Sequence, residues 1–131
     1  GQIEINAELN KIDQKRYKVI ESDIFSGVKD KYDYILANPP YVAEERKDQV
    51  QESVLEQEPR DAVFGGEDGL QYIRKFLKQV KDFLVPGGVV YLEFDSPQKD
   101  EVVSMARKFG ASEVVPHKDQ YNKWRYARIV F

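Results

Sequence analysis

Apolar and polar positions along the chain follow two spacings, one typical of strands and one typical of helices. The polar first stretch, Gln2 to Lys15, is interpreted as the tail of a helix. Two short β-prone runs follow, Tyr17–Glu21 and Tyr32–Ala37, and the second is largely apolar, as expected for a strand covered on both faces. It ends at Asn38-Pro39-Pro40, because proline cannot donate to a strand ladder and restricts the residue before it. The pattern therefore predicts two strands before the longest loop of the chain.

The remainder of the chain continues this alternation. A helical spacing ends at the turn Pro86-Gly87-Gly88, and a buried strand follows at Val89–Phe94. Ser96-Pro97 predicts the cap of a second helix, and Glu113–Pro116 and Arg125–Phe131 are the last two strand candidates. The apolar positions of the first helix are Leu70, Ile73, Leu77, Val80 and Leu84. Strands alternating with helices predict an α/β fold with a mostly parallel sheet and right-handed crossovers.

Composition narrows the class of protein. The chain has 131 residues, which is room for one domain, and a formal charge of −3, which argues against coating nucleic acid through bulk charge. There is no apolar stretch long enough for a membrane span and no signal-peptide pattern, so we expect a cytoplasmic protein with no membrane partner. Cysteine is absent and His117 is the single histidine, which makes a thiolate or His-rich metal site implausible.

The informative motif is Asn38-Pro39-Pro40-Tyr41, at the carboxyl end of a predicted strand, where open α/β sheets bind ligands. Two prolines fix the backbone so that the Asn38 side chain and the Pro39 carbonyl can accept hydrogen bonds from one planar NH₂ group. Tyr41 offers that group a flat face. Such a site would orient a weakly nucleophilic nitrogen without a strong base. The competing interpretation is a proline-rich turn without chemistry, and the position at a strand end favours the functional one.

The motif resembles the signature of S-adenosylmethionine-dependent methyltransferases that modify amino or amide nitrogens. The blocks Glu58–Leu70 and Leu84–Gly88, the strand residues Tyr91–Glu93 with Gln98 soon after, and the ending from His117 with Arg125 are similar to HemK-type release-factor glutamine methyltransferases. These blocks keep the order and spacing of that family from about Asn6 to the last residue.

The resemblance implies a class I methyltransferase fold around a seven-stranded sheet, and methyl transfer to the glutamine amide in the Gly-Gly-Gln loop of a peptide chain release factor. Carried over by residue, Asn38 would hold the target amide and touch the cofactor, and Pro39 would supply the backbone acceptor. Pro40 would stiffen the turn and Tyr41 would stack on the amide. Asp23 and Ile24 would lie beside the adenine of S-adenosylmethionine.

The sequence departs from the family in one large respect. The family has a glycine-rich loop after its first strand and an acidic residue after its second, and this chain has neither. We therefore expect an incomplete Rossmann-like sheet lacking those two strands, with residues 1–131 forming the carboxyl-terminal part of the catalytic domain and inactive alone. The exposed edges left behind predict that Tyr17–Glu21 pairs directly with Tyr32–Ala37, or that strands pair between two copies in a homodimer.

Other interpretations stay open at the level of sequence. N6-adenine methylation of DNA or RNA uses the same tetrapeptide, although the Glu58–Leu70 block favours the glutamine enzymes. A non-catalytic fragment or binding module is the second alternative, because half of the cofactor site is absent. Basic residues and Trp124 near the end could contact nucleic acid, but the acidic chain makes this the weaker interpretation. Glu93 could be a base, and hydrogen bonding to the Asn38–Tyr41 loop is the favoured role.

Overall fold

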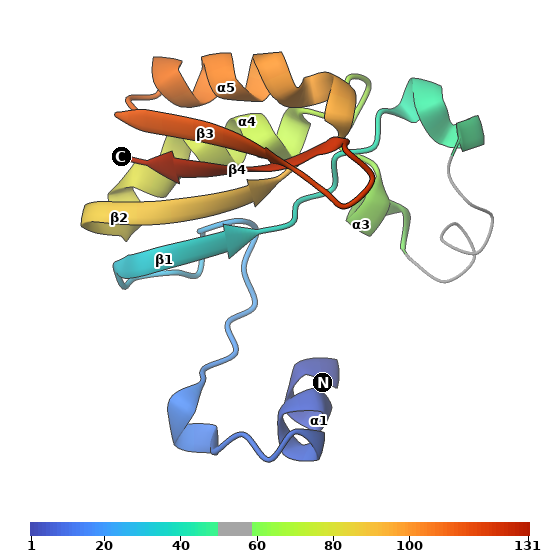
Figure 1. Ribbon diagram of the computed structural model, residues 1–131. Helices are drawn as coiled ribbons and strands as arrows, with labels where there is room; N and C mark the ends of the chain where they lie inside the picture. Colours follow the sequence, from blue (N-terminus) through green and yellow to red (C-terminus); the bar gives the residue numbers. More distant parts are fainter. Residues whose placement is uncertain (50–58) are drawn as a thin grey trace.

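The computed structural model describes residues 1–49 and 59–131, so Glu58 of the predicted block lies outside the described residues. Figure 1 shows a twisted sheet backed by helices, with the first helix, α1, standing apart from it. The α-helices are α1 (Gln2–Leu9), α3 (Arg60–Val63), α4 (Gln71–Gln79) and α5 (Lys99–Lys108). The short 3-10 helices are η1 (Gln14–Arg16), η2 (Glu44–Gln49), η3 (Val80–Phe83) and η4 (Ser96–Gln98). The strands are β1 (Tyr32–Ala37), β2 (Leu84–Glu93), β3 (Glu113–Lys118) and β4 (Trp124–Val130).

The described strands form a four-stranded sheet in the order β1-β2-β4-β3. This confirms the predicted α/β class, but the expectation of a mostly parallel sheet is wrong. Only β1 and β2 run parallel, whereas β4 is antiparallel to both β2 and β3. The reason is local: β3 and β4 are joined by a short hairpin, and such a connection can link only antiparallel neighbours.

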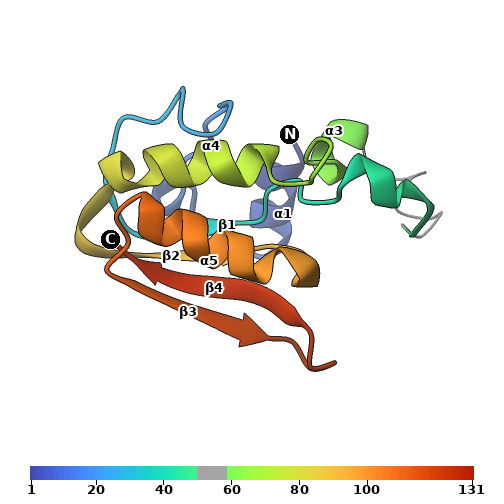
Figure 2. The same cartoon turned by 90° about the horizontal axis from the view of Figure 1, so that it is seen from above.

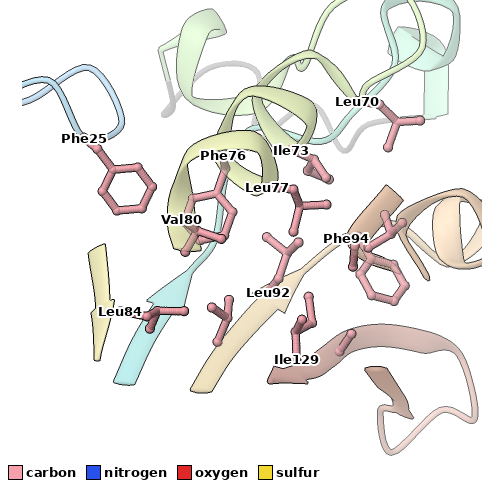
Figure 3. Close-up of a cluster of buried hydrophobic side chains, with 14 residues drawn as sticks. Phe25, Leu70, Ile73, Phe76, Leu77, Val80, Leu84, Leu92, Phe94 and Ile129 are labelled. Carbon is pink, nitrogen blue, oxygen red and sulfur yellow. The ribbon is translucent and has the colours of Figure 1, made fainter. Parts of the chain in front are cut away.

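One face of the sheet is covered by α4 and α5, as the view from above shows (Figure 2). The core lies between the sheet and these helices (Figure 3). Five of its side chains are at 0% exposure: Leu92 in β2, Phe94 directly after β2, Ile129 in β4, and Ile73 and Leu77 in α4. Burial of this apolar surface, at roughly 25 cal/mol per Å², is the main favourable contribution to the stability of the sheet–helix layer.

The opposite face and the free edge of β1 are less well covered. Tyr34 is 64% exposed and Leu36 is 78% exposed, because both point away from the helices. The prediction that Tyr17–Glu21 pairs with β1 is wrong, since these residues form no strand and β1 has β2 as its one neighbour in the described sheet. A strand needs a ladder partner to satisfy its backbone, and Tyr17–Glu21 pairs with no strand of the described sheet.

Two local predictions also need correction. The helix does not continue to Pro86-Gly87-Gly88, because η3 ends at Phe83 and β2 already begins at Leu84. The Pro-Gly-Gly segment instead bulges within β2: Tyr32 pairs with Leu84 but Tyr34 pairs with Val89, and Gly87 has φ +77°. The turn before α5 is capped by Asp95 rather than Ser96. Within the described part, no helix combines the length and apolar character needed to cross a membrane.

Candidate functional site

The predicted motif lies where the sequence analysis expected it, directly after β1. Parallel pairing places Ala37 beside Leu92, so the segment that leaves β1 starts next to Glu93 at the carboxyl end of β2. The two ends are joined by a side-chain hydrogen bond, in which the Tyr41 hydroxyl donates to Glu93 Oε1 at 2.7 Å. Two elements of the sheet therefore converge on this loop.

The two acceptors proposed for the motif are available. Asn38 is exposed, and within residues 1–49 and 59–131 no hydrogen bond engages its side-chain amide or the carbonyl oxygen of Pro39. Within the described residues neither atom receives a hydrogen bond, so each keeps its capacity to accept one. Their role with a substrate stays a prediction.

A second loop, Gly65–Gly69, holds the motif in place. Gly65 N donates to the Val42 carbonyl at 2.9 Å, and Glu44 N donates to the Gly66 carbonyl at 3.1 Å. Val42 N in turn donates to the carbonyl of Val63 at 3.1 Å, which completes a short parallel bridge. The residues after Tyr41 are thus fixed through their backbone, independently of their side chains.

Close approach between the two loops requires glycine at two positions. A Cβ atom on Gly65 would meet the Pro40 carbonyl oxygen, and one on Gly69 would meet the Tyr41 carbonyl oxygen. Gly69 also has φ +73°, which an L-residue with a side chain adopts at a cost. The glycines of this block therefore serve the geometry of the Asn38–Tyr41 loop.

Gln98 is a residue of the site whose role the sequence analysis missed. It is 8% exposed, and its Nε2 donates to the Tyr41 carbonyl at 2.8 Å and to the Asp68 carbonyl at 3.3 Å. Its Oε1 accepts from Asp95 N at 2.9 Å, while Asp95 forms an ion pair with Arg46 at 2.7 Å. The position of Gln98 soon after the β2 strand was noted, but its contacts are non-local and left no signal in the chain's periodicity.

The electrostatics of the site keep Tyr41 protonated. Burial, followed by the hydrogen bond to Glu93 and the negative charge of that carboxylate, raises the pKa of Tyr41 to about 12. A phenol with this pKa keeps its proton at physiological pH and donates a hydrogen bond to Glu93. Tyr41 is therefore protonated and is no general base here.

Asp23 and Ile24, the residues expected beside the adenine, lie in a separate turn. Ser22 Oγ donates to the Ile24 carbonyl at 3.2 Å and accepts from Gly27 N at 2.8 Å, and Ile24 has φ +56°. The turn is attached to the helix layer through Phe25, whose ring stacks on Phe83 with centroids 4.4 Å apart. In the described ranges, no hydrogen bond joins this turn to the Asn38–Tyr41 loop. Their cofactor role stays a prediction.

The described residues do not by themselves form a cradle for a nucleotide-like cofactor. Such a cradle needs a glycine turn leading from a strand into a helix. The glycines with positive φ lie elsewhere: Gly66 and Gly69 in the loop against Tyr41, Gly87 in the β2 bulge, and Gly110 after α5. Within the described residues, none of these glycines forms a turn that leads from a strand into a helix.

Comparison with known proteins decides the family. The model of the methyltransferase small domain family matches residues 2–67, which is half of the chain. The chain belongs to the methyltransferase small domain family. This assignment confirms the resemblance drawn from the motif and its flanking blocks.

Relatives of this methyltransferase chain carry a consistent name. It is 37% identical over 106 residues to the release factor glutamine methyltransferase of Streptococcus pneumoniae, covering 80% of this chain and 38% of that protein. It is 32% identical over 125 residues to the release factor glutamine methyltransferase of Lactococcus lactis, covering 95% of this chain and 45% of that protein. The chain therefore spans less than half the length of these relatives.

Solved structures agree with the methyltransferase fold. A methyltransferase from Pyrococcus furiosus superposes with a TM-score of 0.67 at 24% identity, covering 98% of this chain and 54% of that one. The E. cuniculi Mtq2–Trm112 complex, responsible for methylation of the eRF1 translation termination factor, matches with a TM-score of 0.58 at 17% identity, covering 96% and 68%. At these identities the likeness establishes the fold.

Proposed function

We propose that this chain is the carboxyl-terminal, methyl-acceptor part of an S-adenosylmethionine-dependent methyltransferase that modifies a glutamine side-chain amide in a peptide chain release factor. The observation that carries the proposal is a pair of acceptors, Asn38 Oδ1 and the Pro39 carbonyl, to which no described residue donates a hydrogen bond, on a loop fixed from several sides. The names of the relatives support the choice of substrate.

The chain's own residues would act by positioning. The two N–H bonds of a primary amide would donate to Asn38 Oδ1 and to the Pro39 carbonyl, while the amide plane would rest on the Tyr41 ring. Holding both hydrogens would fix the orientation of the amide nitrogen and remove the rotational freedom of the glutamine side chain. The entropy cost of orienting the amide is then met on binding, which lowers the activation barrier. S-adenosylmethionine supplies the methyl group when bound, and Asp23, Ile24 and Asn38 are the residues proposed to lie beside it.

The proposal includes the inactivity of the chain alone. The part of the chain that the structure describes supplies the acceptor loop without a glycine cradle, so the donor side would have to come from another segment or polypeptide. N6-adenine methylation remains the competing chemistry, since an exocyclic adenine NH₂ could occupy the same two acceptors.

A chimera tests the proposal. The region of the Streptococcus pneumoniae enzyme that aligns with this chain is replaced by this chain, and methyl incorporation is measured with a release factor and with an adenine-containing oligonucleotide. We expect labelling of the release factor at its Gly-Gly-Gln glutamine and none of the oligonucleotide. A folded chimera that labels only the oligonucleotide, or neither substrate, would overturn the proposal.

A further inference from the structure

Tyr41 is held through its backbone carbonyl and through its side-chain hydroxyl, and the two partners come from different elements. Its carbonyl oxygen accepts from Gln98 Nε2 at 2.8 Å, and its hydroxyl donates to Glu93 Oε1 at 2.7 Å. The backbone of the loop would stay in place through Gln98 and the glycine block if the hydroxyl contact were lost. The contact with Glu93 therefore acts on the ring of Tyr41 rather than on the path of the chain.

Glu93 is well placed to fix that ring because its own backbone is immobilised. It is the last residue of β2, and its neighbours Leu92 and Phe94 are both 0% exposed in the core. The β2–β4 register pairs Glu93 with Tyr126, and Phe94 N donates to the Arg125 carbonyl at 2.9 Å. A carboxylate on such a strand end has little freedom to follow a moving partner.

Charge gives this contact more strength than an ordinary hydrogen bond. A phenol donating to a carboxylate is a charge-assisted pair, and the 2.7 Å distance lies in the range of such bonds. Among the surrounding charged groups, Arg125 faces the Tyr41 hydroxyl, while its own ion pair with Asp119 is long, at 3.4 Å. The hydroxyl is therefore committed to the protein and is not free to donate to a ligand.

We propose that Glu93 is a positioning residue that anchors the Tyr41 hydroxyl, so that the face of the Tyr41 ring, and not its oxygen, is presented to the acceptor amide. This inference rests on the proposed function for its catalytic meaning, and on the hydrogen bonds of the Tyr41 hydroxyl and carbonyl for its geometry. Glu93 itself touches neither substrate nor cofactor in this account, and it acts only through Tyr41.

The first test concerns geometry and needs no activity. Tyrosine labelled with ¹³C at Cζ is introduced into the whole chain, and the Tyr41 signal is assigned as the one missing from Tyr41→Phe. Glu93→Ala should shift the Tyr41 signal and lower the pH at which this phenol ionises. Glu93→Gln, which keeps an acceptor without the charge, should give an intermediate result. Glu113→Gln is the matched control, since its carboxylate is bonded to Arg128 at 3.0 Å on the same sheet.

The second test concerns catalysis and uses the chimera. Glu93→Ala should lower kcat about 10- to 100-fold, the scale expected when a reacting group is misplaced, and Glu93→Gln should restore part of it. If Glu93 acts through Tyr41, the double variant Tyr41→Phe with Glu93→Ala should be no slower than the slower single variant.

The outcomes separate this inference from the proposed function. An inactive wild-type chimera would count against the proposed function, while the ¹³C measurement would still decide whether Glu93 anchors Tyr41. An unchanged Tyr41 signal in Glu93→Ala, or fully additive losses in the double variant, would overturn the positioning role. A kcat unchanged in Glu93→Ala would overturn it equally.

Discussion

Gln98 Nε2 donates a hydrogen bond of 2.8 Å to the carbonyl oxygen of Tyr41, a residue 57 positions earlier in the sequence. The same amide reaches the Asp68 carbonyl and accepts from Asp95 N. One buried side chain therefore joins the loop after β1, the glycine block before α4 and the turn before α5. The site is a consequence of this junction rather than of the tetrapeptide alone.

Replacing Gln98 should loosen the whole junction. Gln98→Ala leaves two carbonyl oxygens and one N–H without their partner in a buried region, and we expect a loss of about 2–4 kcal/mol in the free energy of unfolding. Gln98→Glu keeps the acceptor for Asp95 N but removes both donors, so it should be nearly as destabilising. Urea denaturation of the chain measures both. A loss below about 0.5 kcal/mol in both variants would contradict the junction's importance.

Two glycines with similar backbone angles give a matched pair of substitutions. Gly69 has φ +73° and Gly87 has φ +77°, but a Cβ on Gly69 would meet the Tyr41 carbonyl whereas nothing lies within 4 Å of one on Gly87. Gly87→Ala should cost about 1–2 kcal/mol from backbone strain alone. Gly69→Ala carries the same strain and a clash, so thermal denaturation should show a clearly larger loss. Equal losses would mean that the loops do not approach as closely as described.

Asp68 makes part of the stability dependent on pH. The Leu70 N–H and then the Arg74 side chain favour the carboxylate and hold the pKa of Asp68 below its usual value of 3.8. Because the pKa is lower in the folded state, the Asp68 carboxylate stabilises the fold at pH values above 3.8. This contribution is lost as the pH falls through the lowered pKa of the folded state. Asp68→Asn should therefore be less stable than the wild type at pH 7, with the difference shrinking in acid. A difference that grows in acid would contradict this sign.

The periodicity of the chain predicted the elements that depend on local pattern. Tyr32–Ala37 is a strand with the expected bounds, and the strand expected at Val89–Phe94 is the second half of β2, which ends one residue earlier, at Glu93. The sequence did not reveal the features that depend on contacts between segments far apart in the chain. Tyr17–Glu21 has the composition of a strand but no neighbour to pair with, and the contacts of Gln98 join segments far apart in the chain. The Asn38–Tyr41 loop could be predicted because proline ends a strand through its own covalent structure, which is visible in the sequence.

The free edge of β1 leads to a prediction about association. Leu36 is 78% exposed on a strand whose outer edge is unpaired in the described sheet, and such edges recruit other strands. We expect the isolated chain to form a strand-paired homodimer, detectable as a concentration-dependent mass in analytical ultracentrifugation. Leu36→Lys should shift it to the monomer. A wild-type chain that remains monomeric at all concentrations would contradict the expectation.

Asn38 gives the most direct test of the central claim, that this chain holds the acceptor amide. In the chimera, Asn38→Ala removes one of the two acceptors while the Gln98 junction and the glycine block stay in place. We predict a loss of release-factor methylation of about 100-fold or more in kcat, with unchanged stability, because the amide would no longer be oriented. Asn6→Ala, on the exposed side of α1, is the control and should retain full activity. Methylation at the wild-type rate by Asn38→Ala would contradict the account.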